Sequence, residues 1–104
     1  MLEYEISDKQ GERGYLRLRG TLVEDVTVAE FTRALERHYI DDGVKDIVVD
    51  LSDVTEISLE GVGTLLQLRK ESQNRGKRFL IEGAQGRARS RLEITGTLPI
   101  LEEG

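Results

Sequence analysis

Four blocks of the sequence show the hydrophobic pattern of β-strands. Apolar and polar residues alternate over residues 2–6, which predicts a half-buried strand. Residues 15–18 predict a second strand, which we expect to pair with the first as a hairpin before Gly20 breaks the pattern. The continuous β-branched run within residues 46–51 is typical of a strand covered on both faces. Residues 79–81 predict another short buried strand.

Three further blocks repeat their apolar residues at spacings of three and four, as amphipathic helices do. Residues 27–30 fit a capping box, in which a threonine hydroxyl and a glutamate carboxylate satisfy free amides at a helix start. Residues 58–73 predict a second helix, with Gly76 as its left-handed C-terminal residue. Residues 85–94 predict a weaker third helix. The expected inward residues are Val28, Phe31, Leu35 and Tyr39, then Leu59, Val62, Leu65, Leu66 and Leu68, then Ala88 and Leu92.

The order of these elements predicts the fold class. Strands that alternate with helices of this length imply βαβ crossovers, and therefore an α/β fold with a mixed, mostly parallel sheet. Three apolar residues within residues 98–101 predict one last short strand, next to the single proline. The residues expected to join the central strands to the two main helices are Val48, Phe31, Leu35, Leu66 and Leu80.

Composition narrows the function classes. The chain carries 15 basic and 20 acidic residues, and its formal charge of −5 makes it poorly suited to neutralise a nucleic-acid backbone. It has no cysteine, which excludes disulfides, thiolate nucleophiles and zinc-thiolate sites. Neither a signal peptide nor the roughly 20-residue apolar run of a membrane span is seen. We therefore expect a cytoplasmic protein that binds no nucleic acid and does not insert into membranes.

Residues with catalytic or metal-binding chemistry are few. His38 is the single histidine, which excludes a histidine metal pair, and the acidic pairs at residues 41–42 and 102–103 are adjacent rather than spaced as ligands. The glycines of residues 61–63 lack the third glycine of a dinucleotide fingerprint and the lysine of a P-loop. The three arginines of residues 87–91 point in different directions on a helix and predict a solvated face. The sequence predicts no catalytic residue, no metal site, no cofactor and no enzyme.

Residues 50–66 form the most informative segment. They predict a buried strand, a polar connection and an abrupt helix start. Gly61 and Gly63 fall in the first turns of that helix, where each glycine costs about 1 kcal/mol relative to alanine. Either the helix lies very close to a neighbouring element, or an exposed helix tip admits another protein. The sequence leaves both explanations open for each glycine.

Several short motifs follow one another in a recognisable order. In chain order they are Gly20-Thr21-Leu22, then Asp50-Leu51-Ser52 with Val54, Ile57, Gly61 and Gly63, then residues 76–81 and residues 91–96. In this order and spacing they resemble the STAS domain, the fold of bacterial anti-sigma factor antagonists. The resemblance covers nearly the whole chain. It implies a single STAS domain over residues 1–104, with helices packed mainly on one face of a mixed, mostly parallel sheet.

The resemblance also implies a mechanism. In the family, a serine at the start of this helix is phosphorylated by an anti-sigma factor that is also a kinase. The unphosphorylated form binds that kinase and frees the sigma factor, and phosphorylation ends the binding. A doubly charged group disrupts such a contact surface through desolvation and repulsion. In register with Gly61 and Gly63, however, the phosphorylated serine falls on Leu59, which has no hydroxyl.

Three interpretations of this departure follow. In the first, Ser58 accepts the phosphate one residue earlier. In the second, Glu60 supplies a fixed negative charge. In the third, the domain binds its partner without phosphorylation. Ser58 also fits a helix N-cap, and Glu60 also fits a favourable charge in the first helical turn.

The helix start is the predicted partner-binding surface. Leu59 is either an exposed apolar anchor or a core residue folded under the helix. The expected function is a regulatory interaction domain, an anti-sigma factor antagonist, that binds an anti-sigma factor or similar regulatory protein as a monomer or weak dimer. The alternative is a STAS subunit of a larger assembly, such as a signalling scaffold or lipid-transport complex, without phosphorylation. The predicted surface residues are Ser58, Leu59, Glu60, Gly61, Val62, Gly63 and Thr21.

Overall fold

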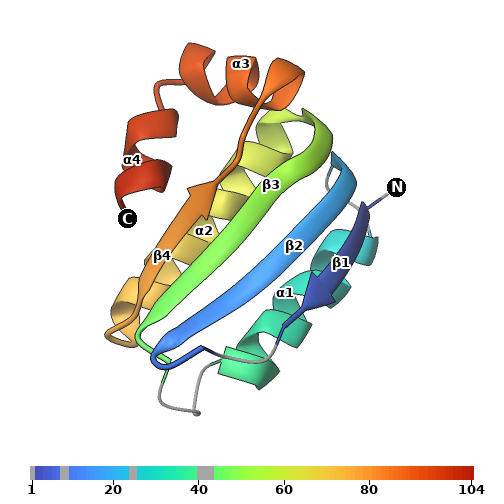
Figure 1. Cartoon of the computed structure of the whole chain (residues 1–104). Coiled ribbons are helices and arrows are strands. Elements are labelled where there is room, and N and C mark those ends of the chain that lie inside the picture. Colours follow the sequence, from blue (N-terminus) through green and yellow to red (C-terminus); the bar gives the residue numbers. More distant parts are fainter. Residues whose placement is uncertain (1, 8–9, 24–25, 40–43) are drawn as a thin grey trace.

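The computed structural model describes residues 2–7, 10–23, 26–39 and 44–104. These residues form four strands and four helices (Figure 1). In chain order they are β1 (Leu2–Ile6), β2 (Arg13–Leu22), α1 (Val26–Tyr39), β3 (Asp46–Ile57), α2 (Leu59–Asn74), β4 (Arg78–Glu82), α3 (Gly86–Ile94) and α4 (Leu98–Glu103).

The strands form one mixed sheet in the order β1-β2-β3-β4. β1 and β2 are antiparallel, as the predicted hairpin requires, whereas β2–β3 and β3–β4 are parallel. Parallel neighbours need a crossover connection, and α1 and α2 provide the two crossovers. Figure 1 shows α1 and α2 behind the sheet, with α3 across one end of it and α4 beside β4. The predicted α/β fold class, with its mostly parallel sheet, is confirmed.

The core lies between the sheet and the two crossover helices. Side chains alternate along a strand, so every second residue of β3 and β4 points toward the helices. Phe31 and Leu35 of α1 are buried in this core, as predicted, and so are Ala88 and Leu92 of α3. The strand residues of the core include Leu16, Leu18, Ile47, Val49, Leu51, Phe79 and Ile81.

Val48 and Leu80 do not join this core, contrary to the prediction. Val48 is fully buried, but its neighbours Ile47 and Val49 point toward the helices, so Val48 points to the opposite face. There it lies between its register partners Tyr15 and Leu80, which are half-buried. The β-branched run gave the correct strand, but the face that each residue occupies depends on the register of the sheet.

Leu66 of α2 is half-buried at the edge of the core, where full burial was expected. Its neighbour Leu65 is completely buried, and Leu68 is buried one turn later. The side of α2 that faces the sheet is therefore narrower than the broad apolar side that the sequence indicates.

The C-terminal apolar residues form a helix, and the predicted last strand is wrong. Leu98 and Leu101 of α4 are buried, at the three-residue spacing of a helix face. Pro99 lies in the first turn, where its fixed backbone angle suits a helix and its missing amide has no partner to lose. Four residues are too few to separate the two-residue period of a strand from the period of a helix.

β2 and β3 both run further than the pattern predicts. Gly20 does not end β2, because its positive φ of 98° and an adjacent register shift let the strand continue to Leu22. β3 continues to Ile57, the register partner of Leu22. The two strands therefore end together, at the start of α2.

The start and end of α1 were predicted from residues that are only partly described. The helix already includes Val26, so Thr27 lies inside it rather than ahead of it as a cap. Residues 41–42 lie outside the described part of the chain. So do the side chains of Thr27, Val28, His38 and Tyr39.

Candidate partner-binding surface

Ser58 connects the end of β3 to the start of α2. Its backbone is extended, and its hydroxyl oxygen accepts a hydrogen bond from the Gly61 amide at 3.0 Å. Its amide donates to the Leu22 carbonyl at 3.2 Å, and its hydroxyl lies 3.5 Å from the same oxygen. Ser58 is therefore the N-cap of α2, and its half-buried hydroxyl has a hydrogen-bond partner on each side.

Gly61 and Gly63 serve different purposes. A Cβ atom built at Gly61 would collide with the Leu22 carbonyl oxygen and would lie 3.1 Å from the Ile57 side chain. Gly61 is therefore needed for the close approach of α2 to the end of β2. A Cβ at Gly63 would meet nothing within 4 Å. Close packing thus explains Gly61, and Gly63 leaves the helix backbone open to solvent.

The first turns of α2 have a covered side and an open side. Val62 is 5% exposed and points toward the core, in line with the buried Leu65 three residues later. Leu59 is 61% exposed, and Glu60 is also exposed. Leu59 therefore does not fold under the helix into the core.

The end of β2 borders this turn. Thr21 is half-buried and is the register partner of Glu56 on β3. Val23 follows Leu22, whose carbonyl receives the Ser58 amide, and the Val23 side chain is 42% exposed. Val23 was not among the predicted surface residues.

Two side chains hold α3 against the end of β3. The Gln85 amide nitrogen donates to the Ser52 carbonyl at 2.8 Å, and Arg91 Nε donates to the Ile57 carbonyl at 3.1 Å. Arg87 is exposed one turn before Arg91. The predicted solvated face is therefore wrong for Arg91, which contacts the residue just before the cap of α2. A side chain that donates to a backbone carbonyl far along the chain leaves no sequence pattern.

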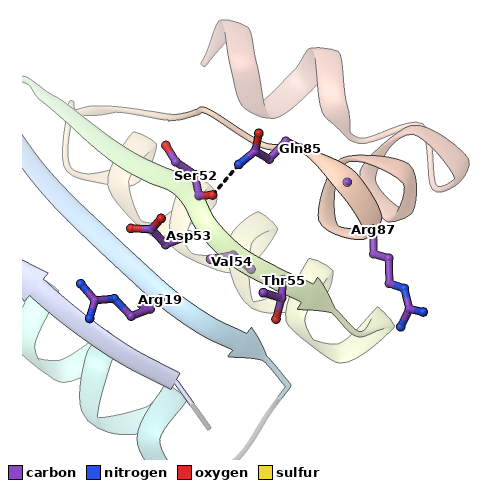
Figure 2. Close-up of a pocket in the computed structure, with 8 residues that line it drawn as sticks. Arg19, Ser52, Asp53, Val54, Thr55, Gln85 and Arg87 are labelled. Atoms are coloured by element: carbon purple, nitrogen blue, oxygen red, sulfur yellow. Dashed lines mark hydrogen bonds between the residues drawn. The ribbon is translucent and has the colours of Figure 1, made fainter.

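A shallow groove of about 740 Å³ lies between the second half of β3 and the start of α3. Figure 2 shows Arg19 and Arg87 at opposite ends of this groove, pointing away from each other. Asp53 lies beside Arg19 as its register partner. The polar groups of the groove therefore do not converge on one point, as a catalytic or small-ligand site requires.

Hydrogen bonds and one ion pair fix the Asp50-Leu51-Ser52 motif. The Asp50 carboxylate accepts hydrogen bonds from the Ser52 amide, at 2.9 Å, and from the Ser52 hydroxyl, and it pairs with Arg17 at 3.4 Å. Partial burial raises the pKa of Asp50, but the Ser52 hydrogen bonds and the Arg17 charge outweigh burial and leave this pKa below its ordinary value. A Cβ at Gly83 would lie 2.5 Å from the Ser52 hydroxyl, so the residue just after β4 packs directly against Ser52.

Neither a metal-binding cluster nor a membrane-spanning helix is found among the described residues. Within residues 2–7, 10–23, 26–39 and 44–104, no three histidine, cysteine, aspartate or glutamate side chains are grouped so as to hold a metal ion. In the same part of the chain, no helix is long and apolar enough to cross a bilayer. What the helix start offers is an exposed leucine, an exposed glutamate and an uncovered backbone.

Sequence comparison identifies the family. Residues 6–102 match the STAS domain. The chain belongs to the STAS domain family. The resemblance carried by the motifs is therefore confirmed, and it extends over nearly the whole chain. A search of the curated proteins gives no significant match.

Solved structures share the STAS fold. The anti-sigma factor antagonist SpoIIAA in its unphosphorylated form aligns with a TM-score of 0.78 and 18% identity, over 93% of this chain and 84% of that chain. An anti-sigma factor antagonist from Mycobacterium paratuberculosis aligns at 0.77 and 20% identity, over 97% and 83%. A sulfate transporter family protein from Wolinella succinogenes aligns at 0.74 and 18% identity, over 93% and 77%.

The predicted surface residues divide into three groups in this STAS domain. Gly61 and Val62 are buried, which corrects their placement on the surface, because one faces the Leu22 carbonyl and the other faces the core. Ser58 and Thr21 are half-buried at the edge. The exposed residues are Leu59, Glu60 and Gly63.

Proposed function

We propose that this STAS domain is a regulatory protein–protein interaction domain, an anti-sigma factor antagonist that binds an anti-sigma factor and so releases a sigma factor. The observation that best supports the proposal is the exposed leucine at the first position of α2. Leu59 is 61% exposed, and Gly63 leaves the adjoining backbone uncovered. An apolar side chain beside an open backbone suits the centre of a protein contact.

In this proposal, residues 1–104 act as one cytoplasmic domain, a monomer or weak dimer. The domain uses no cofactor, catalyses no reaction and contacts neither nucleic acid nor membrane. Leu59, Glu60 and Gly63 touch the partner, with Ser58 and Thr21 at the edge of the contact. Gly61 and Val62 support the contact from beneath.

The proposed binding does not depend on phosphorylation. Leu59 offers no hydroxyl, and the Ser58 hydroxyl is engaged as the cap of α2, 3.5 Å from a backbone carbonyl oxygen. A phosphate on Ser58 would place its negative charge beside that oxygen, which disfavours it. Glu60 is an exposed acidic residue whose charge does not depend on phosphorylation, and a charge at the edge of a contact tunes partner choice more than affinity.

The test uses the kinase-type anti-sigma factors encoded in the same genome. Calorimetric titration is expected to give binding to one of them, with equal affinity before and after incubation with ATP. Mass spectrometry is expected to find no phosphate in residues 58–64. Binding to none of these proteins contradicts the proposed function. Phosphate on Ser58 with loss of affinity contradicts only the independence from phosphorylation.

The alternative function is a permanent subunit of a larger assembly, such as a signalling scaffold or lipid-transport complex. The observation that favours it is the leucine at the family's serine position, because a permanent subunit needs no switch. Purification of the tagged chain from its native cells separates the two functions. The alternative predicts stoichiometric co-purification with assembly subunits, and the leading proposal predicts a chain that dissociates from its partner.

A further inference from the structure

Exposed apolar side chains gather at one end of the molecule. Among the described residues, the large apolar side chains with high exposure are Tyr4, Val23, Leu59, Ile94 and Ile100. Val23, Leu59 and Ile94 are 42%, 61% and 81% exposed, and they come from the end of β2, the start of α2 and the end of α3. Single exposed apolar residues are common, but three from separate elements that meet at one end of the molecule need a reason.

Two hydrogen bonds bring these three elements together. The Ser58 amide donates to the Leu22 carbonyl, which places Val23 beside the first turn of α2. Arg91 Nε donates to the Ile57 carbonyl, which places the outer side of α3 beside the same turn. Figure 1 shows α3 crossing the sheet at the end where α2 begins.

Ile94 lies on the side of α3 that faces away from the core. Arg87, Arg91 and Ile94 follow one another at spacings of four and three, so they share one face of the helix. The core contacts of α3 are made by Ala88 and Leu92 on its other side. The fold therefore does not need an isoleucine at residue 94, which is the most exposed of the large apolar side chains in the described part of the chain.

Charged residues border this apolar group on two sides. Glu60 directly follows Leu59, and Glu56 lies two residues before Ser58. Both are exposed, and neither forms an ion pair with another described residue. Arg87 is likewise exposed and without an ion pair among the described residues, on the α3 side. The surface therefore has an apolar centre, an acidic edge and a basic edge.

We infer that Val23, Leu59 and Ile94 form one docking surface for a folded protein, with Ile94 as a second anchor beside Leu59. The inference rests on the proposed function and adds the chemistry of the partner. That partner presents an apolar patch with a basic group opposite Glu60 and an acidic group opposite Arg87. Complementary charges on two edges fix one orientation of docking. The net charge of −5 disfavours an anionic membrane or a nucleic acid as the occupant.

The test compares two isoleucines that differ in position. Ile94→Glu is expected to weaken binding to the anti-sigma factor by about tenfold or more, as loss of an interface anchor does. Ile100→Glu introduces the same charge at a 44% exposed residue of α4, which lies beside β4 (Figure 1), and is expected to leave affinity unchanged. Circular dichroism and thermal unfolding check that both variants fold as the wild type does. Wild-type affinity of a folded Ile94→Glu variant overturns the inference and leaves the proposed function intact.

A second measurement decides the case in which no anti-sigma factor binds, which contradicts the proposed function. A photo-crosslinking amino acid is placed at residue 59, 94 or 100 of the full chain in its native cells. One adduct common to residues 59 and 94, absent at residue 100, and lost from residue 94 when Leu59→Glu is added, supports the docking surface. The absence of a common adduct overturns it. An adduct with the mass of two copies of this chain overturns it in favour of self-association.

The charged edges have their own test. Glu60→Lys and Arg87→Glu are each expected to slow association and to weaken the dependence of the association rate on ionic strength. Glu103→Lys, an exposed acid in α4 without an ion pair among the described residues, is the matched control for the first variant. Association rates that are the same for all three variants contradict the assigned charge pattern.

Discussion

The two ends of α2 differ in what they expose. At the C-terminal end, Gly76 adopts a φ of 74°, and the Lys77 amide donates to the Ser72 carbonyl at 2.8 Å. The Lys77 side chain is buried and donates to the Val44 carbonyl. At the N-terminal end, the Ser58 hydroxyl caps the helix by accepting from the Gly61 amide, yet Leu59 remains 61% exposed.

The two ends of α2 differ in the exposure of an apolar side chain and not in whether they are capped. Hydrogen bonds cap both ends, so the exposed leucine is not a consequence of a helix end without a cap. The C-terminal end is closed by its own chain. The N-terminal end keeps an apolar side chain in water, and covering such a side chain with a partner lowers the free energy. This contrast is therefore the basis of the proposal that the N-terminal end is the contact surface.

The largest expected effect is on the side of α2 that is buried in the core. Leu65→Ala is expected to lower the free energy of unfolding by about 2–5 kcal/mol, because Leu65 is completely buried. Leu66→Ala is the matched control and is expected to cost clearly less, because Leu66 is half-buried. Urea unfolding of both variants measures the difference. Equal costs would show that the assigned orientation of α2 is wrong.

Gly61 and Gly63 lie within one turn of α2 but differ in the space around them. Gly61→Ala is expected to destabilise the fold by about 1–3 kcal/mol, because its methyl group would collide with the Leu22 carbonyl. Gly63→Ala is expected to stabilise the fold by up to about 1 kcal/mol, because its methyl group meets open space in a helix. Thermal unfolding gives both signs. A stabilising Gly61→Ala would contradict the close approach of α2 to the end of β2.

The cap of α2 has a smaller expected effect. Ser58→Ala is expected to cost about 0.5–2 kcal/mol, because the Gly61 amide loses its acceptor. Ser58→Asp restores an acceptor and adds a negative charge at the helix N-terminus, so it is expected to keep most of the wild-type stability. Urea unfolding of the pair measures the capping contribution. Equal loss in both variants would mean that the hydroxyl acts in another way.

The smallest effect concerns the strand that leads to the open end. The pKa of Asp50 is lower in the folded state than its ordinary value of 3.8, so the unfolded chain binds more protons at acidic pH. The stability that Asp50 contributes is therefore present above pH 3.8 and is lost as the pH falls through its folded pKa. Asp50→Asn is expected to flatten this part of the stability curve. Superimposable wild-type and variant slopes below pH 4 or so would contradict the assignment.

Much of the fold could be predicted from the sequence, because long elements carry a clear period. The alternation of residues 2–6 and the β-branched run of residues 46–51 each mark a strand. The extension of β2 could not be predicted, because Gly20 interrupts the pattern as a turn does and only the bulged sheet lets the strand continue. Residues 98–101 were assigned to the wrong element because so short a segment has no distinguishable period.

The candidate surface could be predicted only in part. The segment from Ser58 to Gly63 was located by its glycines and by the family resemblance, but the orientation of Leu59 was left open. That orientation follows from the contact between Gly61 and the Leu22 carbonyl, which joins residues far apart in the chain. Val23 and Ile94, which belong to the proposed docking surface, were not among the predicted surface residues, because neighbours in space leave no spacing in the sequence.

The most direct test of the exposed anchor is Leu59→Glu, measured for stability and for binding on the same preparation. A change at an exposed site is expected to alter the free energy of unfolding by no more than about 0.5 kcal/mol. Affinity for the anti-sigma factor is expected to fall by about tenfold or more. Ile100→Glu, measured beside it, is expected to change neither quantity. A Leu59→Glu variant that unfolds, or that stays folded and binds as tightly as the wild type, would contradict the assignment of this helix start as the contact surface.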